Sequence, residues 1–249
     1  MKVYDTVIIG CGYAPFGYAL TKGNCAIIEK EQSADTRFYL PLKNFKASNY
    51  TPITQLGKQL LELYISMGLI KNQMINLSGL ECGFCEFISN YDVDIYFKSR
   101  VISISQKDGL SQVLVHGVNG ITTIYAKQVI DSTKSSNNEE YLTILYATEK
   151  PEVVKCALES AFEKCLVETA FFDDRYAVHI PVCEQYNTAK RNVFEKWKSL
   201  NLDAKIIHMS PVLGCKSTEG SPLNDDLYDS PIQAIDSGVD FANSQKEEK

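Results

Sequence analysis

The chain has 249 residues, of which 45% are hydrophobic and 22% charged, which excludes disorder, collagen and a whole-chain coiled coil. Its net charge of −6 argues against nucleic acid as a partner, because duplex binding needs clustered Lys and Arg. No stretch approaches the ~20 apolar residues that span a bilayer, and the N-terminus lacks the features of a signal peptide. We therefore expect a cytoplasmic protein without a membrane span, whose eight cysteines are thiols.

The first thirty residues predict a β-α-β unit. Residues 6–9 and 25–28 are short apolar runs rich in β-branched side chains, as in buried parallel strands. Residues 13–21 suit a helix, which the following Gly23 and Asn24 end. The unit therefore has the order of a dinucleotide-binding half.

Three residues of this unit predict its chemistry. Gly10 allows a tight turn out of the first strand, and Gly12 lets a diphosphate approach the backbone. We expect the amides at the start of the helix to be free for that diphosphate. Glu29, at the end of the second strand, can accept hydrogen bonds from a ribose 2′-OH, and its charge disfavours the 2′-phosphate of NADP.

The glycine pattern departs from G-x-G-x-x-G at its third position. Pro15 stands there, and Gly17 follows two residues later. Proline is tolerated in a first helical turn, but it removes one amide donor. A half that keeps its turn glycines for packing alone therefore remains an alternative.

The next segment combines a helix with a predicted antiparallel meander. Residues 53–67 carry apolar side chains at helical spacing, and the preceding residues 37–52 resemble an extended loop. A strand over 93–97 precedes three strands within about 100–126, separated by Asp108-Gly109 and Asn119-Gly120 turns. A further apolar strand is predicted over 128–131.

The C-terminal half alternates helices and strands. Ser230 and Pro231 provide an N-cap and an N1 proline for a last helix, through about residue 243, before a frayed tail. The other expected elements are a loop over 134–140, helices over 152–167 and 188–200, strands over 176–182 and 204–208, and a loop over 214–229.

Three separated segments together resemble the FAD-dependent oxidoreductases of the two-dinucleotide-binding-fold superfamily. They are residues 4–30, 93–133 and 212–242, in the order of that family. The resemblance implies an α/β, Rossmann-type FAD-binding fold: a parallel sheet with helices on both faces, an antiparallel β-meander as a third layer, and a small inserted α+β cap. It implies an FAD-binding domain of residues 1–135 plus 205–249 and a substrate cap of residues 136–204.

The resemblance also implies where non-covalent FAD would bind. The loop of residues 220–226 and the start of the Ser230 helix would approach the flavin ring. The implied cofactor-binding residues are Gly10, Gly12 and Ala14 at the diphosphate, Glu29 at the adenosine ribose, Lys30 and Val101 beside the adenine, and Ser132 and Thr133 near the diphosphate.

The expected reaction is hydride exchange between a small organic substrate and the flavin. His179, in the cap, and His208, before the C-terminal loop, are the candidate proton-transfer residues, and His116 is expected at the surface. Pro15, the short cap, and Lys134 where the family has glycine favour an alternative: an inactive scaffold or partner protein that has lost flavin. A partner subunit or a homo-oligomer is compatible with both.

Cys82 and Cys85 form a C-x-x-C pair. Such a pair is a redox dithiol, half of a zinc site or two ordinary thiols. No second pair of suitable spacing accompanies it, so no metal is expected.

Overall fold

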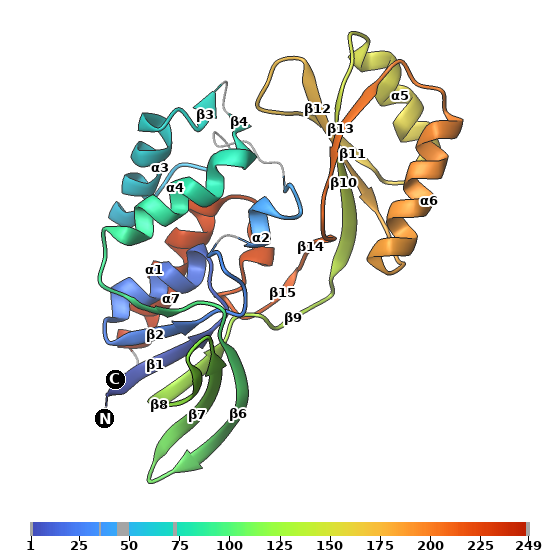
Figure 1. Ribbon diagram of the computed structural model, residues 1–249. Coiled ribbons are helices and arrows are strands. Elements are labelled where there is room, and N and C mark those ends of the chain that lie inside the picture. The colour runs from blue at the N-terminus through green and yellow to red at the C-terminus, as the bar shows by residue number, and fades with distance from the viewer. Residues whose placement is uncertain (1, 35, 44–49, 72–73, 248–249) are drawn as a thin grey trace.

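The computed structural model describes residues 2–34, 36–43, 50–71 and 74–247. A larger lobe carries both ends of the described chain, and a smaller cap stands beside it (Figure 1). The helices are α1 (Tyr13–Lys22), α2 (Thr36–Tyr39), α3 (Gln55–Ser66), α4 (Leu77–Ser89), α5 (Pro151–Ala161), α6 (Tyr186–Ser199), the 3-10 turn η2 (Asp225–Leu227) and α7 (Pro231–Glu247).

The strands of the larger lobe are β1 (Val3–Ile9), β2 (Cys25–Ile28), β3 (Ile70–Lys71), β4 (Met74–Ile75), β5 (Asp94–Tyr96), β6 (Arg100–Lys107), β7 (Leu110–Gly117) and β8 (Gly120–Asp131). The remaining strands are β9 (Ser135–Ser136), β10 (Glu139–Ala147), β11 (Leu166–Thr169), β12 (Arg175–Pro181), β13 (Lys205–Met209), β14 (Gly214–Lys216) and β15 (Glu219–Gly220).

The main sheet confirms the predicted β-α-β unit. Its strand order is β5-β2-β1-β8-β7-β6, and β1 pairs in parallel with both β2 and β8. Gly10 ends β1 with a φ of 94°, a value that favours glycine, and its amide donates to the carbonyl of Ile28 at 2.8 Å. The carboxyl ends of β1 and β2 therefore lie side by side, which is where ligands bind in such sheets.

The predicted meander and the predicted return strand share one strand. β8 runs without a break over 12 residues, pairing first with β7 and then with β1. The sequence suggested two strands, over 121–125 and 128–131, because the polar Lys127 and Gln128 break the apolar alternation near residue 127. Both side chains are exposed while the backbone pairing continues, so polarity at these positions did not mark a turn.

The two faces of the main sheet are covered differently. Ile8 and Ile27 point into a core shared with α1, α3, α4 and α7. Val7 and Ile28 pack on the opposite side against meander residues such as Val113 and Ile124. The expected parallel sheet and third-layer meander are confirmed, but the expectation of helices on both faces is wrong, because the meander folds over one of them (Figure 1).

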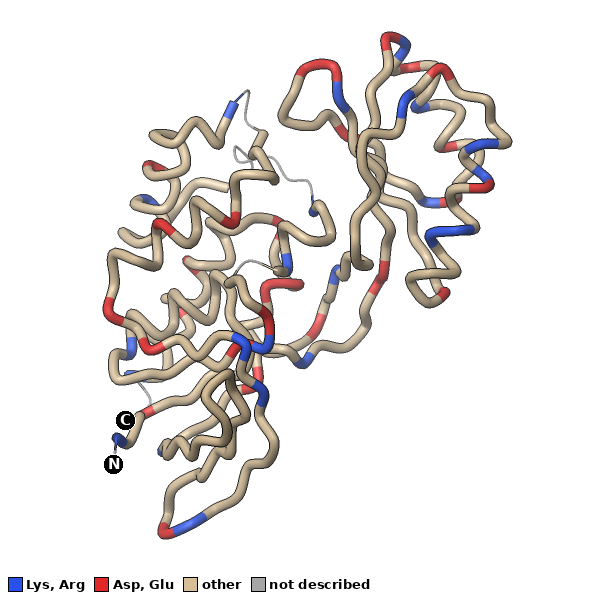
Figure 2. The backbone as a smooth tube through the Cα atoms, viewed as in Figure 1, with Lys and Arg blue, Asp and Glu red and all other residues tan. Residues whose placement is uncertain are grey.

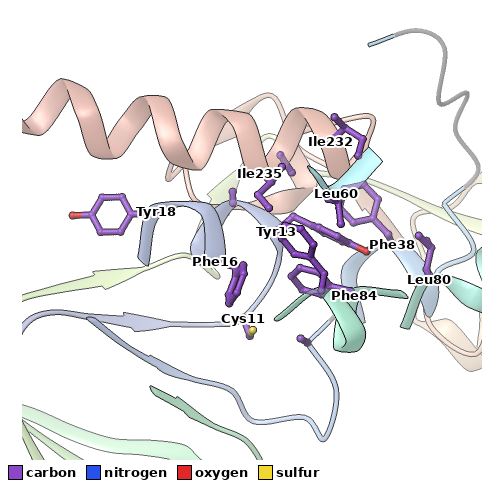
Figure 3. Packing of buried hydrophobic residues seen from close by; sticks show 14 of the residues in the cluster. Cys11, Tyr13, Phe16, Tyr18, Phe38, Leu60, Leu80, Phe84, Ile232 and Ile235 are labelled. Atoms are coloured by element: carbon purple, nitrogen blue, oxygen red, sulfur yellow. The ribbon is translucent and has the colours of Figure 1, made fainter. Parts of the chain in front are cut away.

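Close packing fixes the start of α1 among the helices. Tyr13 is fully buried, and its ring centroid lies 4.0 Å from that of Phe84 (Figure 3). Its hydroxyl lies 2.7 Å from that of Tyr64. A Cβ on Gly17 would overlap the Ile235 carbonyl, and one on Gly238 would overlap that of Ala14. Gly17, which looked misplaced in the glycine pattern, therefore allows α1 and α7 to touch.

The cap has its own sheet and core. Its strand order is β11-β12-β10-β13, and β14 also pairs with β10. Helices α5 and α6 cover one face, and Trp197 packs there against Tyr146. The sheet also contains β13 and β14, so its strand pairing extends to Lys216.

Several predicted boundaries in this half are corrected. The helix expected to residue 167 ends at Ala161, because Leu166 and Val167 pair with β12 instead. The expected loop over 134–140 contains β9 and the start of β10. The last helix includes residues expected to fray and reaches Glu247. Part of the expected loop 37–52, residues 44–49, lies outside the described residues.

Charge is distributed over both lobes. Figure 2 shows Lys and Arg interspersed with Asp and Glu along the backbone of the larger lobe and of the cap. Within the residues that the structure describes, no helix is both long and apolar enough to cross a membrane.

Candidate functional site

A cavity of about 510 Å³ opens at the carboxyl ends of β1 and β2. We call it the β1–α1 cavity. Segments far apart in the sequence meet on its wall: the turn after β1, the end of β2, α2, the start of β6, the end of β8 and η2. Six sequence-predicted residues line it, namely Gly10, Glu29, Lys30, Val101, Ser132 and Thr133.

Glu29 is held in one orientation at this cavity. Its side chain is almost fully buried, and Oε2 accepts the amide of Cys11 at 2.7 Å. Oε1 accepts the amide of Glu31 at 2.8 Å. Each carboxylate oxygen has a second lone pair, so Glu29 can accept further hydrogen bonds from a ligand in the cavity.

The end of β8 is tied to the end of β1. The Ser132 hydroxyl donates to the carbonyl of Ile9 at 2.7 Å. The amide and hydroxyl of Thr133 donate to Asp131 at 3.0 and 2.6 Å. These bonds fix the cavity floor. The Lys30 ammonium is more loosely placed, since it is exposed and lies 3.7 Å from the Glu31 carboxylate.

The start of α1 differs from its expected state. The amide of Tyr13 donates to Asp225 Oδ2 at 2.8 Å, and that of Ala14 donates to Oδ1 at 2.9 Å. A Cβ on Gly12 would overlap the same carboxylate. The amides expected to be free for a diphosphate therefore already hold an anion from the chain itself. Gly12 and Ala14 are buried beneath it.

Burial dominates the electrostatics of Asp225. It raises the pKa of the carboxyl to about 6, while the hydrogen bonds from the Ala14 and Tyr13 amides act in the opposite direction. Burial also raises the pKa of the neighbouring Asp226, and the guanidinium of Arg37, which forms an ion pair with Asp226, opposes this. Two carboxyl groups and one cation thus share this wall of the cavity.

Arg37 and the individual roles of Asp225 and Asp226 were not found by sequence reasoning. Both aspartates lie in the loop 220–226 that was expected near the flavin, but neither was predicted to contact the start of α1. The available signal was the Asn224-Asp225-Asp226 run, in which Asn224 accepts the Asp226 amide at 2.9 Å and starts η2. Arg37 lay in a segment expected to be loop, and it is in fact on α2.

A second cavity of about 500 Å³ separates the cap from the larger lobe. We call it the interlobe cavity. From the cap it is lined by residues of β10, β11 and β12, including Tyr141, Glu168 and His179. From the larger lobe it is lined by Lys43 and by the start of α7, including Ser230. Cavities between lobes are preferred places for small-molecule binding.

His179 lies on the cap wall of this cavity with a partner at each ring nitrogen. Nδ1 is 2.9 Å from the Thr143 hydroxyl, and Nε2 is 3.6 Å from Glu168 Oε2. The Tyr141 ring packs edge-on against the imidazole at a centroid distance of 5.3 Å. The side chain is only 11% exposed, so its orientation is well determined by its neighbours.

Lys43 forms part of the opposite wall. It is nearly buried, its ammonium donates to the carbonyl of Tyr228, and it lies 4.9 Å from the centroid of the Phe38 ring. Burial lowers its pKa, and the charge of Asp226 opposes that effect. The interlobe cavity therefore has Lys43 on one wall and His179 and Glu168 on the other.

The remaining histidines and the C-x-x-C pair lie outside both cavities. His208 is exposed on β13 and, among the described residues, is not part of either cavity wall. His116 is exposed on β7, as expected. Cys82 and Cys85 are exposed one turn apart on α4. No group of three His, Cys, Asp or Glu side chains in the described ranges could hold a metal.

Comparison with known proteins supports the fold. No family model matches this chain, and no curated protein matches it in sequence. A geranylgeranyl bacteriochlorophyll reductase-like protein from Thermoplasma acidophilum superimposes with a TM-score of 0.61 at 15% identity, over 99% of this chain and 79% of that protein. A flavoprotein/dehydrogenase from Cytophaga hutchinsonii gives 0.55 at 12% identity, over 99% and 79%.

A third similar structure contains FAD itself. Aklavinone-11 hydroxylase, solved with FAD and aklavinone, gives a TM-score of 0.54 at 9% identity, over 97% of this chain and 62% of that protein. This chain thus spans less than two thirds of that protein. At these identities the likeness concerns the fold alone: the chain has the Rossmann-type fold found in flavin-dependent oxidoreductases.

Proposed function

We propose that the chain binds FAD without a covalent link in the β1–α1 cavity and exchanges hydride with a small organic substrate in the interlobe cavity. One observation carries this proposal. Gly10, Glu29 and Val101, with the end of β8, come from separate parts of the sequence and line one cavity. The fold around that cavity is shared with a hydroxylase solved with FAD.

The residues present fit the adenosine half of the cofactor. Glu29 keeps its carboxylate on the cavity wall, with acceptor capacity remaining for a ribose hydroxyl. Val101, at the start of β6, offers backbone groups beside the expected adenine position. A carboxylate at Glu29 would repel a 2′-phosphate, so NADP would bind poorly here.

The start of α1 fits an anion in principle. Its amides already bind a carboxylate, and the positive end of the helix dipole favours any negative group there. A diphosphate at these amides would take the place that the Asp225 carboxylate holds. Pro15 has no amide hydrogen, so the amides of Tyr13 and Ala14 are the donors that a diphosphate would use here.

On the substrate side, His179 would hold or move a proton. Bound FAD would supply the acceptor or donor of hydride, and the protein would orient the substrate against it. Thr143 and Glu168 would fix the imidazole so that one tautomer faces the substrate. Lys43, on the opposite wall, would orient an anionic or carbonyl oxygen of the substrate.

The alternative, a protein that keeps the fold without flavin, also has an observation in its favour. The amides at the start of α1 are satisfied by Asp225 without any ligand. Such a chain would need no cofactor to complete its hydrogen bonds. The two functions differ in what happens when FAD is added.

A thermal-shift series with FAD, NAD and ADP tests the proposal. A ligand that binds only the folded chain raises its apparent stability. We expect FAD to raise the unfolding temperature in a concentration-dependent way, and NAD to do so less. If FAD at millimolar concentration leaves the unfolding temperature unchanged, the flavin-free alternative is the correct function.

A further inference from the structure

Asp225 and Asp236 both satisfy the start of a helix from elsewhere in the chain. Asp236, on α7, accepts the amides of Ile53 and Thr54 at 2.8 and 3.2 Å, at the start of α3. Asp225 accepts those of Tyr13 and Ala14 at the start of α1. Both carboxylates are buried, so each contributes to holding its helix in place.

Only Asp225 accepts its helix amides at the wall of a cavity. Asp225 lines the β1–α1 cavity, whereas Asp236 lines neither cavity among the described residues. Their supports differ as well. Asp236 lies within the 17 residues of α7, and Asp225 lies in the three-residue turn η2. The contact of Asp225 is therefore one that a ligand in the cavity could reach and replace.

We propose that Asp225 is an internal competitor of the cofactor diphosphate: it occupies the anion position at the start of α1, and a diphosphate binds there only by displacing it. The nature of the ligand rests on the proposed function. Each amide has one proton to donate, so the Tyr13 and Ala14 amides cannot serve two anions fully at once. Two anions in this buried space would also repel each other.

The surroundings of Asp225 suit such an exchange. Gly12 carries no side chain, and the space that a Cβ would fill is taken by the carboxylate. A ligand oxygen entering that space would contact the same backbone. Arg37, paired with Asp226 on the same wall, also acts electrostatically on Asp225 and is available as a partner for the displaced carboxylate.

The proposal predicts that Asp225 weakens binding of ligands with a diphosphate and of no others. The probes are FAD, ADP and adenosine, titrated by calorimetry into the wild-type chain, Asp225→Asn and Asp236→Asn. Asp236→Asn is the matched control, because it alters a buried capping carboxylate away from the cavity. Circular dichroism and unfolding curves establish that each variant is folded.

We expect Asp225→Asn to bind FAD and ADP roughly tenfold or more tightly than the wild type, since charge-assisted hydrogen bonds are the stronger competitors. Adenosine should bind both equally, and Asp236→Asn should match the wild type for all three probes. A second measurement needs no variant. In the wild type, ADP should shift the amide NMR signals of Tyr13 and Ala14 and the side-chain carboxyl signal of Asp225.

Other results would overturn the proposal. If Asp225→Asn binds FAD and ADP as tightly as the wild type or more weakly, Asp225 does not compete with the diphosphate. If ADP binds the wild type without shifting the Asp225 carboxyl signal, the carboxylate is not displaced. If ADP binding tightens in the variant while FAD binds neither chain, the competition stands and the flavin function fails. If neither ligand binds either chain, both fail.

Discussion

Glu29 and Cys11 join the ends of the first two strands. The Cys11 amide donates to Oε2 of Glu29 at 2.7 Å, across the gap between the turn after β1 and the end of β2. Burial raises the pKa of the Cys11 thiol well above its usual range, so the thiol stays neutral beside this carboxylate. Within this pair, only the Glu29 carboxylate places a negative charge at the cavity wall.

Replacing Glu29 by Gln should weaken FAD binding. The single oxygen of Gln can still accept the Cys11 amide, but its NH2 group cannot accept the Glu31 amide, so the variant loses one local hydrogen bond. A neutral acceptor also holds a ribose hydroxyl less strongly. We expect a loss of about 1–2 kcal/mol, or roughly tenfold in affinity, measured by titration of FAD fluorescence. Glu31→Gln, at the exposed neighbouring carboxylate, is the control. Equal losses in both variants would contradict a specific role for Glu29.

The buried Asp225 should make stability depend on pH. Its pKa in the folded chain is about 6, above the ordinary 3.8, so between these values the folded chain binds the proton more tightly than the unfolded chain. The contribution to stability is therefore present below pH 4 and is lost as the pH rises through about 6. It amounts to about 3 kcal/mol at most.

Urea unfolding of the wild type and Asp225→Asn between pH 4 and 7.5 checks this sign. Arg37 and Asp226 are present in both chains, so the comparison isolates the titration of Asp225 together with its electrostatic coupling to these two groups. The wild type should lose stability relative to the variant as the pH rises toward 7. A difference that stays constant with pH, or grows in favour of the wild type, would argue against a raised pKa.

His179 should matter for turnover and not for cofactor binding. Its ring lies on the interlobe wall, bonded to Thr143, and not on the wall of the β1–α1 cavity. We expect His179→Gln to slow flavin reduction by substrate by a factor of about 10² or more while the affinity for FAD is unchanged.

Two further histidines provide controls for that variant. His116→Gln on β7 and His208→Gln on β13 alter exposed side chains away from both cavities. Each should leave the rate of flavin reduction near that of the wild type. A slow His208→Gln chain together with a normal His179→Gln chain would reverse the assignment.

Because α1 and α7 are in close contact, the stability of the chain should depend on Gly238. Ala at a helix position usually adds about 1 kcal/mol of stability relative to Gly. A Cβ on Gly238, however, would overlap the Ala14 carbonyl. We therefore expect Gly238→Ala to destabilise the chain by about 1–3 kcal/mol in urea unfolding. Asn243→Ala, exposed on the same helix, should not destabilise; if Gly238→Ala also stabilises, the close contact is absent.

Local signals explain what the sequence could predict. The β1, α1 and β2 elements follow from short apolar runs and turn glycines, and the Asn119-Gly120 pair predicted its hairpin correctly. β10 was missed because the polar run 134–140 was assigned to a loop as a whole although β10 starts within it at Glu139, and α5 was drawn too long because apolar residues continue past Ala161 into β11. Only pairing with distant strands decides these boundaries.

In the candidate site, too, residues close in sequence could be predicted and contacts between distant segments could not. Gly10 and Glu29 could be placed at the cavity because both lie within the first thirty residues, beside adjacent strands. The partner of the α1 amides could not, because it comes from position 225, near the other end of the chain. Helical capping is usually supplied by the preceding residue, here Gly12, which has no side chain to give.

The visible absorption spectrum of the purified chain decides whether it binds a flavin. We expect a yellow protein, or a colourless one that becomes yellow after incubation with FAD and stays yellow when the excess is removed. In either case it should release FAD on denaturation. A chain that remains colourless after the same treatment would contradict flavin binding.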